Sequence, residues 1–312
     1  MPRAPAILLM GPTGAGKTDV AVMLAERLPL EIVSVDAAMV YRGMDIGTAK
    51  PPKDVQTRAP HHLLDLIDPA ESYSAARFVA DAGDALQAIT ARDRRPLLAG
   101  GTMLYFRAWQ SGLARLPAAD AGIRARLEAR AAEEGWPALH AELAARDPQA
   151  ARRIQPGDRQ RIQRALEVIE ISGRPISDQQ RENLRGAARP SDLRLVLAPA
   201  DRAGLYERLA SRFDNMMRRG LLAEAEALKA RGDLTAAMPS MRLIGYRQLW
   251  DHLEGRSTLA SAVEKAVIAT RQLARRQLTW LRAEPDAEWF DPSERETTLR
   301  IAARIENWLH GH

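Results

Sequence analysis

Residues 6–18 read AILLMGPTGAGKT and largely decide the fold. The apolar run Ala6–Met10 is typical of a buried strand, and it leads directly into the glycine loop Gly11–Thr18. Apolar residues at helical spacing follow in Asp19–Leu28. A strand, a loop of the pattern glycine, four residues, Gly-Lys-Thr, and a helix together predict a phosphate-binding loop.

The residue types in this loop suit a pyrophosphate. Glycines let the backbone amides face an anion, and the amino terminus of the following helix adds its dipole. Lys17 is expected to neutralise phosphate oxygens, and the hydroxyl of Thr18 is expected to ligate Mg²⁺. On this motif alone, a kinase or an ATPase is the better interpretation. The expected pyrophosphate contacts are Gly11, Pro12, Thr13, Gly14, Ala15, Gly16, Lys17 and Thr18.

Further apolar runs alternate with helical patterns and predict an α/β fold with a parallel sheet. Ligands of such sheets bind beyond the carboxyl ends of the strands. We therefore expect Gly11–Thr18, Asp36 and Gly100–Thr102 to converge, although they lie far apart in the chain. The expected strands and helix are Glu31–Val35, Pro96–Ala99 and Ser74–Ala91.

The character of the chain changes to charged helical patterns from about Leu116 to Arg189. This stretch ends in the polar segment Glu182–Pro190, which glycine and proline interrupt. We interpret residues 116–190 as an inserted all-helical domain, and residues 1–115 and 191–312 as a core like that of P-loop nucleoside-triphosphate hydrolases. The expected elements after the insertion are a strand at Leu193–Ala198 and long helices at Arg202–Arg231 and Ser257–Arg282.

The composition is that of a folded protein without thiol chemistry. Hydrophobic residues make up 46% and charged residues 27% of the 312 residues. The absence of cysteine excludes disulfides, a thiolate nucleophile and cysteine-ligated zinc. A formal net charge of +5 weakly favours a polyanionic partner. No run approaches the roughly 20 apolar residues of a membrane span and no cleavable signal opens the chain, so we expect no membrane contact and a cytoplasmic location.

Beyond the phosphate loop, six segments resemble the tRNA dimethylallyltransferases, also called tRNA isopentenyltransferases, in sequence and order. The resemblance covers nearly the whole chain. Members with an added zinc finger need cysteine, so the resemblance is to the bacterial form. The segments are VDAAMVYRGMDIGTAKP at 35–51, HHLLDLIDPAESYSAARF at 61–78, LLAGGTMLYFRAW at 97–109, QRIQRALEVIEISGRP at 160–175, MRLIGYRQLW at 241–250 and RRQLTWLR at 275–282.

The resemblance implies transfer of a dimethylallyl group from dimethylallyl diphosphate to the N6 amine of the adenosine immediately 3′ of the anticodon in tRNA. The partners it implies are the tRNA anticodon stem-loop, dimethylallyl diphosphate and Mg²⁺, and we expect a monomer. By the same resemblance, Asp36 is the general base, Thr102 positions the amine, and Lys17 and Thr18 hold pyrophosphate and magnesium. Arg212 matches an arginine that also touches the pyrophosphate.

Two positions depart from the usual family pattern beside the expected base. Ala37 stands where the family commonly has serine, and Met39 stands where many members have glutamine. A hydroxyl is lost at position 37, and backbone contacts to the acceptor base would remain available. We still expect Asp36, Ala37, Ala38, Met39 and Thr102 to surround that base.

Three basic strips are candidates for tRNA binding, with solvated helix faces or a turn between helices as the alternative interpretation. In the expected helix Asp158–Ser172, Ile162 belongs to an apolar stripe, and the polar residues beside it can read bases and phosphates. The expected tRNA contacts are Arg124, Gln160, Arg161, Ile162, Gln163 and Arg164 in the insertion, Met241, Arg242, Gly245, Tyr246 and Arg247 after it, and Arg275, Arg276 and Arg282 near the end of the last long helix.

Other functions remain open from the residues alone. Asp36 could hold magnesium as in an ATPase, and a small-molecule kinase could use the same loop with Asp36 as base. An enzyme that alkylates free AMP would have less need of the insertion. A non-catalytic RNA-binding protein is disfavoured by the joint presence of Lys17, Thr18, Asp36 and Thr102. His61 and His62 are expected to pack or to form hydrogen bonds, and we assign no metal to them.

Overall fold

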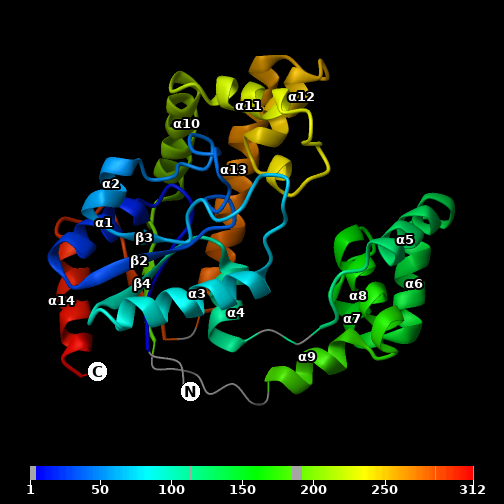
Figure 1. The fold of residues 1–312 in the computed structure, drawn as a ribbon, viewed down its shortest axis with the longest axis horizontal. Helices are drawn as coiled ribbons and strands as arrows, with labels where there is room; N and C mark the ends of the chain where they lie inside the picture. Colours follow the sequence, from blue (N-terminus) through cyan, green and yellow to red (C-terminus); the bar gives the residue numbers. More distant parts are fainter. Residues whose placement is uncertain (1–4, 113, 115, 185–191, 285, 312) are drawn as a thin grey trace. The chain divides into compact units, whose positions relative to one another are not determined.

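The computed structural model describes residues 5–112, 114, 116–184, 192–284 and 286–311 (Figure 1). Within these residues, six strands form one sheet in the order β3-β2-β4-β1-β5-β6, and every strand pairing is parallel. The predicted α/β fold with a parallel sheet is therefore confirmed. The strands are β1 (Ile7–Met10), β2 (Leu30–Val35), β3 (His61–His62), β4 (Arg95–Gly100), β5 (Leu193–Leu197) and β6 (Glu288–Phe290).

Helices make up most of the remaining described chain. They are α1 (Lys17–Arg27), α2 (Lys53–Arg58), α3 (Ala75–Thr90), α4 (Met103–Ser111), α5 (Ala121–Glu134), α6 (Trp136–Arg146), α7 (Pro148–Arg153), α8 (Arg159–Ser172), α9 (Ile176–Leu184), α10 (Arg202–Arg218), α11 (Leu221–Ala230), α12 (Tyr246–Leu253), α13 (Leu259–Leu281) and α14 (Thr297–Leu309), with a single 3₁₀ turn, η1 (Ser240–Arg242).

The central strand of the sheet is β1, which lies between β4 and β5. Its four residues are all buried, as expected for a parallel strand that is covered on both faces. Alternate residues such as Ile7 and Leu9 join one apolar core with Leu24 of α1 and Trp308 of α14. This packing holds the carboxyl end of β1, and with it the glycine loop, in the middle of the sheet edge.

The boundaries of several predicted helices are explained by their caps. The side chain of Ser74 accepts a hydrogen bond from the Arg77 amide at the start of α3, and Asp158 does the same for Arg161 at the start of α8. The helix expected over Arg202–Arg231 is wrong in one respect, because it is two helices, α10 and α11. They separate at Gly220, whose φ of 100° cannot continue a right-handed helix.

Contacts divide the chain into two units, Met1–Arg107 with Pro190–His312, and Ala108–Arg189. In the second unit α5–α9 pack around an apolar core that includes Leu127, Leu139 and Leu166, so the described part of the insertion is helical as predicted. The domain boundaries expected at 115/116 and 190/191 stay a prediction, because residues 115, 190 and 191 lie outside the described residues.

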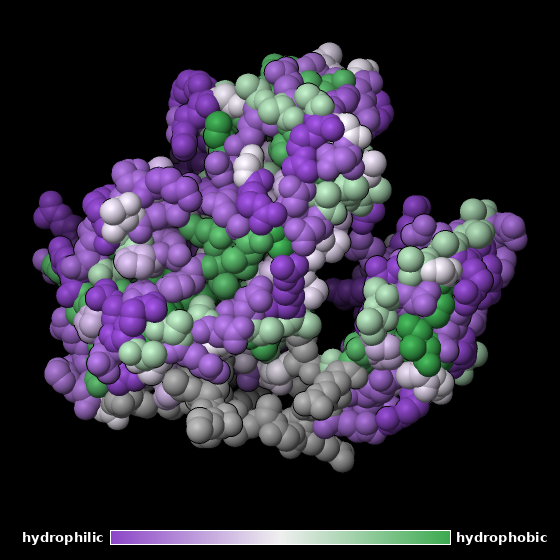
Figure 2. All heavy atoms as spheres, in the orientation of Figure 1, coloured by the Kyte–Doolittle hydropathy of each residue, from purple (hydrophilic) through white to green (hydrophobic). Residues whose placement is uncertain are grey.

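Hydrophilic residues cover most of the visible face of the first unit, and hydrophobic residues gather near the centre of that face (Figure 2). None of the helices in the described ranges combines the length and the apolar character that crossing a membrane requires.

Candidate active site

The glycine loop between β1 and α1 closes around its own lysine. Lys17 is the first residue of α1, and its Nζ donates a hydrogen bond of 2.7 Å to the carbonyl of Pro12. Gly16 precedes the helix with a φ of 81°, a conformation that favours glycine. The loop borders a cavity of about 500 Å³ that Thr18 and Asp19 also line. The predicted phosphate loop therefore has a space beside the positive end of α1, where an anion is favoured.

Two cations meet at this cavity, Lys17 and Arg212 of α10. Burial, and then the neighbouring Arg212, lower the pKa of Lys17 to about 7, while Asp36 acts in the opposite direction. Burial also lowers the pKa of Arg212, against the effect of Asp36 and Asp19. Both shifts express the cost of holding a charge away from water, which a bound anion would offset. The structure thus brings Arg212 to the loop, as predicted.

The expected base and its partner follow two adjacent strands. Asp36 comes directly after β2 and Thr102 shortly after β4, where Val35 pairs with Gly100. Oδ1 of Asp36 accepts a hydrogen bond of 2.8 Å from the amide of Ala38. That bond fixes the carboxyl group and leaves its second oxygen available.

The hydroxyl of Thr102 is oriented by the segment that carries Asp36. Its Oγ1 accepts a hydrogen bond of 3.0 Å from the amide of Ala37. The hydroxyl hydrogen is therefore free to point at a ligand or at Asp36. The convergence of the glycine loop, Asp36 and Thr102 that the sequence predicts is present.

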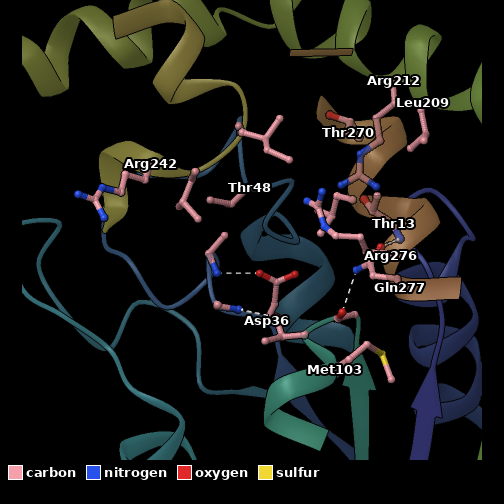
Figure 3. A pocket seen from close by; sticks show the side chains of 18 of the residues that line it. Thr13, Asp36, Thr48, Met103, Leu209, Arg212, Arg242, Thr270, Arg276 and Gln277 are labelled. Carbon is pink, nitrogen blue, oxygen red and sulfur yellow. Dashed lines mark hydrogen bonds between the residues drawn. The ribbon is translucent and has the colours of Figure 1, made fainter. Parts of the chain in front are cut away.

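A second cavity, of about 510 Å³, also borders Asp36 (Figure 3). Thr13, Asp36, Gly101, Arg212 and Gln277 line both cavities. The second cavity is mainly apolar. Its apolar residues are Ala37, Ala38, Met103, Leu104, Leu209, Phe213, Met216, Leu243, Ile244, Leu273 and Trp280.

The three residues that follow Asp36 do not all line the same cavity. Ala37 and Ala38 line the apolar cavity, whereas Met39 lines the cavity of the glycine loop. The hydroxyl of Ser34 donates to the Met39 sulfur at 3.7 Å. Met39 therefore belongs with the cavity of the glycine loop and not with the wall formed by Ala37 and Ala38.

The donor set at the glycine loop fits magnesium shared with a pyrophosphate. The cavity offers the hydroxyl of Thr18 and the carboxylates of Asp19 and Asp36. Mg²⁺ commonly takes one or two protein oxygens and completes its shell with phosphate oxygens and water. Over the described ranges, no group of three or more His, Cys, Asp or Glu side chains is arranged to hold a metal by itself. His61 Nδ1 instead faces the Ala59 carbonyl at 2.6 Å.

In the helical unit, burial contradicts one predicted RNA contact, and two others form ion pairs within the unit. The side chain of Ile162 is buried in the core of the unit, so it cannot contact tRNA. Arg124 and Arg164 form ion pairs with Glu167, which is fully buried. Burial alone would raise the pKa of Glu167, but hydrogen bonds from Arg124 and Arg164 outweigh it and lower that pKa. The two arginines thus pair with a buried acid of the helical unit. Their side chains are still 43% and 31% exposed, so RNA binding by them stays a prediction.

The other polar residues on α8 remain accessible. Gln160 and Arg161 are exposed, and Gln163 donates to the carbonyl of Arg124 at 3.2 Å. Arg161 also lies 3.3 Å from the carboxylate of Asp158. RNA binding by these residues stays a prediction.

The strip at 241–247 also contains both buried and exposed residues. Met241 and Tyr246 are each 1% exposed, which corrects their assignment as side-chain contacts to RNA, because they pack in the core formed by α10–α13. Arg242 and Arg247 are exposed, and Arg242 lines the apolar cavity. Gly245 is the N-cap of α12.

The basic residues at the end of α13 reach solvent. Arg275, Arg276 and Arg282 are all exposed. Arg276 also lines the apolar cavity and lies on the same side of it as Arg212 (Figure 3). RNA binding by these three arginines stays a prediction.

The sequence did not single out Gln277, Glu224 or Glu167. Gln277 bonds to the glycine loop, Glu224 binds the segment 45–47, and Glu167 organises the helical unit. Gln277 and Glu167 lie inside segments quoted for the family resemblance, which was the available signal. Nothing in the sequence distinguishes Glu224 from Glu226, the other acid of α11.

Known proteins match this chain over nearly its full length. The model of a family described as IPP transferase matches residues 39–284. Relatives named tRNA dimethylallyltransferase are 54% identical in Bordetella petrii, covering 98% of both chains, and 55% identical in Thiobacillus denitrificans, covering 96% of both. The solved full-length tRNA isopentenylpyrophosphate transferase from Bacillus halodurans is 36% identical, with a TM-score of 0.71 over 99% of this chain and 96% of that one. A eukaryotic dimethylallyltransferase acting on tRNA, 24% identical, shares the fold with a TM-score of 0.83 over 99% of this chain and 80% of its own.

Proposed function

This chain belongs to the IPP transferase family, and we propose that it transfers the dimethylallyl group of dimethylallyl diphosphate to the N6 amine of the adenosine immediately 3′ of the anticodon in tRNA. The observation that carries this proposal is the position of Asp36 between two cavities. One cavity is lined by Lys17 and Thr18 of the glycine loop, and the other, of nearly the same volume, is mainly apolar with Thr102 in its wall. A base at their junction can serve a reaction between a diphosphate ester and a second substrate.

The proposed step forms one bond and breaks another at the allylic carbon. The N6 nitrogen bonds to that carbon as its bond to the diphosphate oxygen breaks, and the electron pair leaves with the diphosphate. Asp36 accepts the proton that the amine loses, through the carboxyl oxygen that the Ala38 amide does not hold. Thr102, oriented by the Ala37 amide, contributes the hydrogen-bonding group that positions the amine. The products are N6-(dimethylallyl)adenosine and diphosphate.

Negative charge develops on the leaving diphosphate, and cations facing it lower the barrier. Lys17, Arg212 and the amides at the start of α1 provide this stabilisation. A magnesium ion held by Thr18 and the diphosphate oxygens would add to that neutralisation.

The acceptor base must leave its stack before the amine can reach Asp36, and the apolar cavity can receive it. Arg242 and Arg276 are exposed residues that also line this cavity, so they are placed to contact phosphates beside an extruded nucleotide.

The experiment incubates the purified protein with Mg²⁺, dimethylallyl diphosphate and unmodified tRNA, followed by mass spectrometry of the digested nucleosides. We expect one dimethylallyl group on the adenosine 3′ of the anticodon, and none when that adenosine is replaced by guanosine. Modification elsewhere in the tRNA would contradict the proposed position.

Parallel reactions address the two other enzymatic interpretations. Labelled ATP should release no stoichiometric ADP, and ATP should compete at best weakly with dimethylallyl diphosphate. ADP release coupled to turnover would support a kinase. Alkylation of free AMP at the rate seen with tRNA would favour an enzyme that acts on the mononucleotide.

A further inference from the structure

One buried amide joins two loops of the site that lie far apart in the chain. Gln277 of α13 is 7% exposed. Its Oε1 accepts a hydrogen bond of 2.9 Å from the amide of Thr13, and its Nε2 donates one of 2.8 Å to the carbonyl of Gly101 (Figure 3). One partner is a donor and the other an acceptor, so a carboxamide satisfies both at once, which neither an acid nor an apolar side chain can do.

The two loops that Gln277 joins lie past the last paired residues of β1 and β4. The pairing of β1 with β4 runs as far as Met10 and Gly100. Past this pair, Thr13 belongs to the phosphate loop, and Gly101 precedes the Thr102 that contacts the Asp36 segment. Gln277 spans the two loops where backbone pairing has ended.

The side chain of Gln277 packs so closely against Gly101 that position 101 has no room for a Cβ atom. A Cβ atom added to Gly101 would lie 2.5 Å from Nε2 of Gln277 and 3.2 Å from the carbonyl oxygen of Gly11. Five residues of α13 line the apolar cavity. Of these five, Gln277 also lines the cavity of the glycine loop. Its contacts therefore lie on the border across which the two substrates would react.

We propose that Gln277 is a positioning residue that holds the phosphate loop at a set distance from Asp36 and Thr102. This role rests on the proposed function, because it concerns the alignment of the leaving diphosphate with the attacking amine. A displacement of about 1 Å between reacting groups can cost a hundredfold in rate. Loss of both hydrogen bonds would loosen this alignment while leaving the phosphate-binding groups of the loop in place.

The experiment compares Gln277→Met with Gln272→Met, a matched control on the same helix whose side chain is exposed. Methionine keeps the length of the side chain and removes both hydrogen bonds. For Gln277→Met we expect kcat to fall roughly ten- to a hundredfold, while the Kd of inorganic pyrophosphate, measured by calorimetry, changes less than about threefold. The control should match the wild type in both quantities. A kcat within about twofold of wild type would overturn the proposal. An equal loss of pyrophosphate affinity would also overturn it, because Gln277 would then act in binding.

Gly101→Ala tests the same contact from the other side and keeps the proposal falsifiable if Gln277→Met does not fold. The new methyl group should displace the carboxamide and lower kcat by a similar factor. If both changes act through one contact, the double variant should be no slower than the slower single variant. A double variant whose loss of kcat equals the product of the two single losses would overturn the proposal. A wild-type protein that binds pyrophosphate but transfers nothing would reject the proposed function, whereas a fully active Gln277→Met rejects only the role of Gln277.

Discussion

The hydroxyl of Tyr246 on α12 donates a hydrogen bond of 2.5 Å to Oε1 of Glu224 on α11. The same carboxylate accepts hydrogen bonds from the backbone amides of Asp45, Ile46 and Gly47. Burial, and then the nearby Glu224, raise the pKa of Tyr246, so its hydroxyl stays protonated and donates. Four donors thus converge on one carboxylate and join the segment 45–47, whose Gly47 lines the apolar cavity, to α11 and α12.

Changes at these two residues should be coupled. Glu224→Gln presents an NH₂ group where the carboxylate accepts, so we expect the free energy of unfolding to fall by about 1–3 kcal/mol. Tyr246→Phe removes one neutral donor and should cost about 1 kcal/mol. The double variant should lose less than the sum of the single losses, because both break one shared bond. Urea unfolding of the four proteins measures this, and strictly additive losses would mean that the hydroxyl and the carboxylate contribute independently.

Replacement of Asp36 by asparagine should separate binding from rate. Asparagine keeps the size of the side chain and an oxygen that can accept from the Ala38 amide, but it cannot take up a proton. We expect single-turnover transfer to slow by roughly a hundred- to ten-thousandfold, with the affinities for tRNA and pyrophosphate nearly unchanged. Transfer at close to the wild-type rate would show that another group accepts the proton.

The stability of the protein should depend on pH through Lys17, whose pKa is lowered to about 7. Lysine in the unfolded chain titrates near 10.4, so between these values the unfolded state binds more protons than the folded state. The free energy of unfolding of the wild type should therefore rise, relative to that of Lys17→Met, as the pH increases from about 7 to about 10. Urea unfolding of both proteins between about pH 6 and pH 9 provides the comparison. A difference that stays constant with pH would mean that Lys17 keeps its charge throughout this range.

The arginines at the end of α13 should bind tRNA through phosphates. Replacing the exposed Arg275 and Arg276 by alanine should weaken tRNA binding and leave the affinity for dimethylallyl diphosphate nearly unchanged. The slope of log affinity against log salt concentration should decrease by about 0.7–0.9 for each phosphate that the variant no longer neutralises. Filter binding of tRNA at several salt concentrations measures the slope, and an unchanged slope with unchanged affinity would reduce both residues to a solvated helix face.

Arg161 and Arg164 of α8 are expected to differ in what their replacement changes. Arg161 is exposed, and its replacement by alanine should alter discrimination between cognate and non-cognate anticodon loops without a large change in stability. Arg164→Ala removes a partner of the buried Glu167 and should lower the free energy of unfolding by about 1–3 kcal/mol. Thermal unfolding of both variants beside the tRNA-binding assay separates the two effects. Equal loss of stability in the two variants would contradict the structural role of Arg164.

The sequence predicted the parts of the site that depend on local pattern. A strand, the glycine loop and a helix are neighbours in the chain, so the apolar run of β1 and the motif Gly11–Thr18 were sufficient to predict the loop that borders a cavity in the structure. Asp36 and Thr102 come shortly after strands, and the parallel sheet brings strand ends to one edge. The family resemblance then added roles that these patterns alone did not distinguish from those of a kinase.

Side-chain burial was less predictable where an apolar or aromatic residue lies inside a basic strip. Tyr246 and Met241 were expected to face RNA and instead pack among α10–α13. Helical spacing describes one helix at a time, and it does not say which neighbouring helix covers a given side chain.

The apolar runs and the motif spacing of the sequence were enough to predict the α/β fold, the glycine loop and the convergence of Asp36 and Thr102, because the strands of a parallel sheet end at a common edge. The tertiary structure was needed to identify the partners of Gln277 and Glu224, and to bring Arg124 of α5 to Glu167 of α8. Gln277 contacts an amide 264 residues away, and Glu224 contacts amides up to 179 residues away. A single glutamine or glutamate has no local signature for such a contact, since burial and a hydrogen-bond partner are supplied by distant segments that meet only when the chain folds.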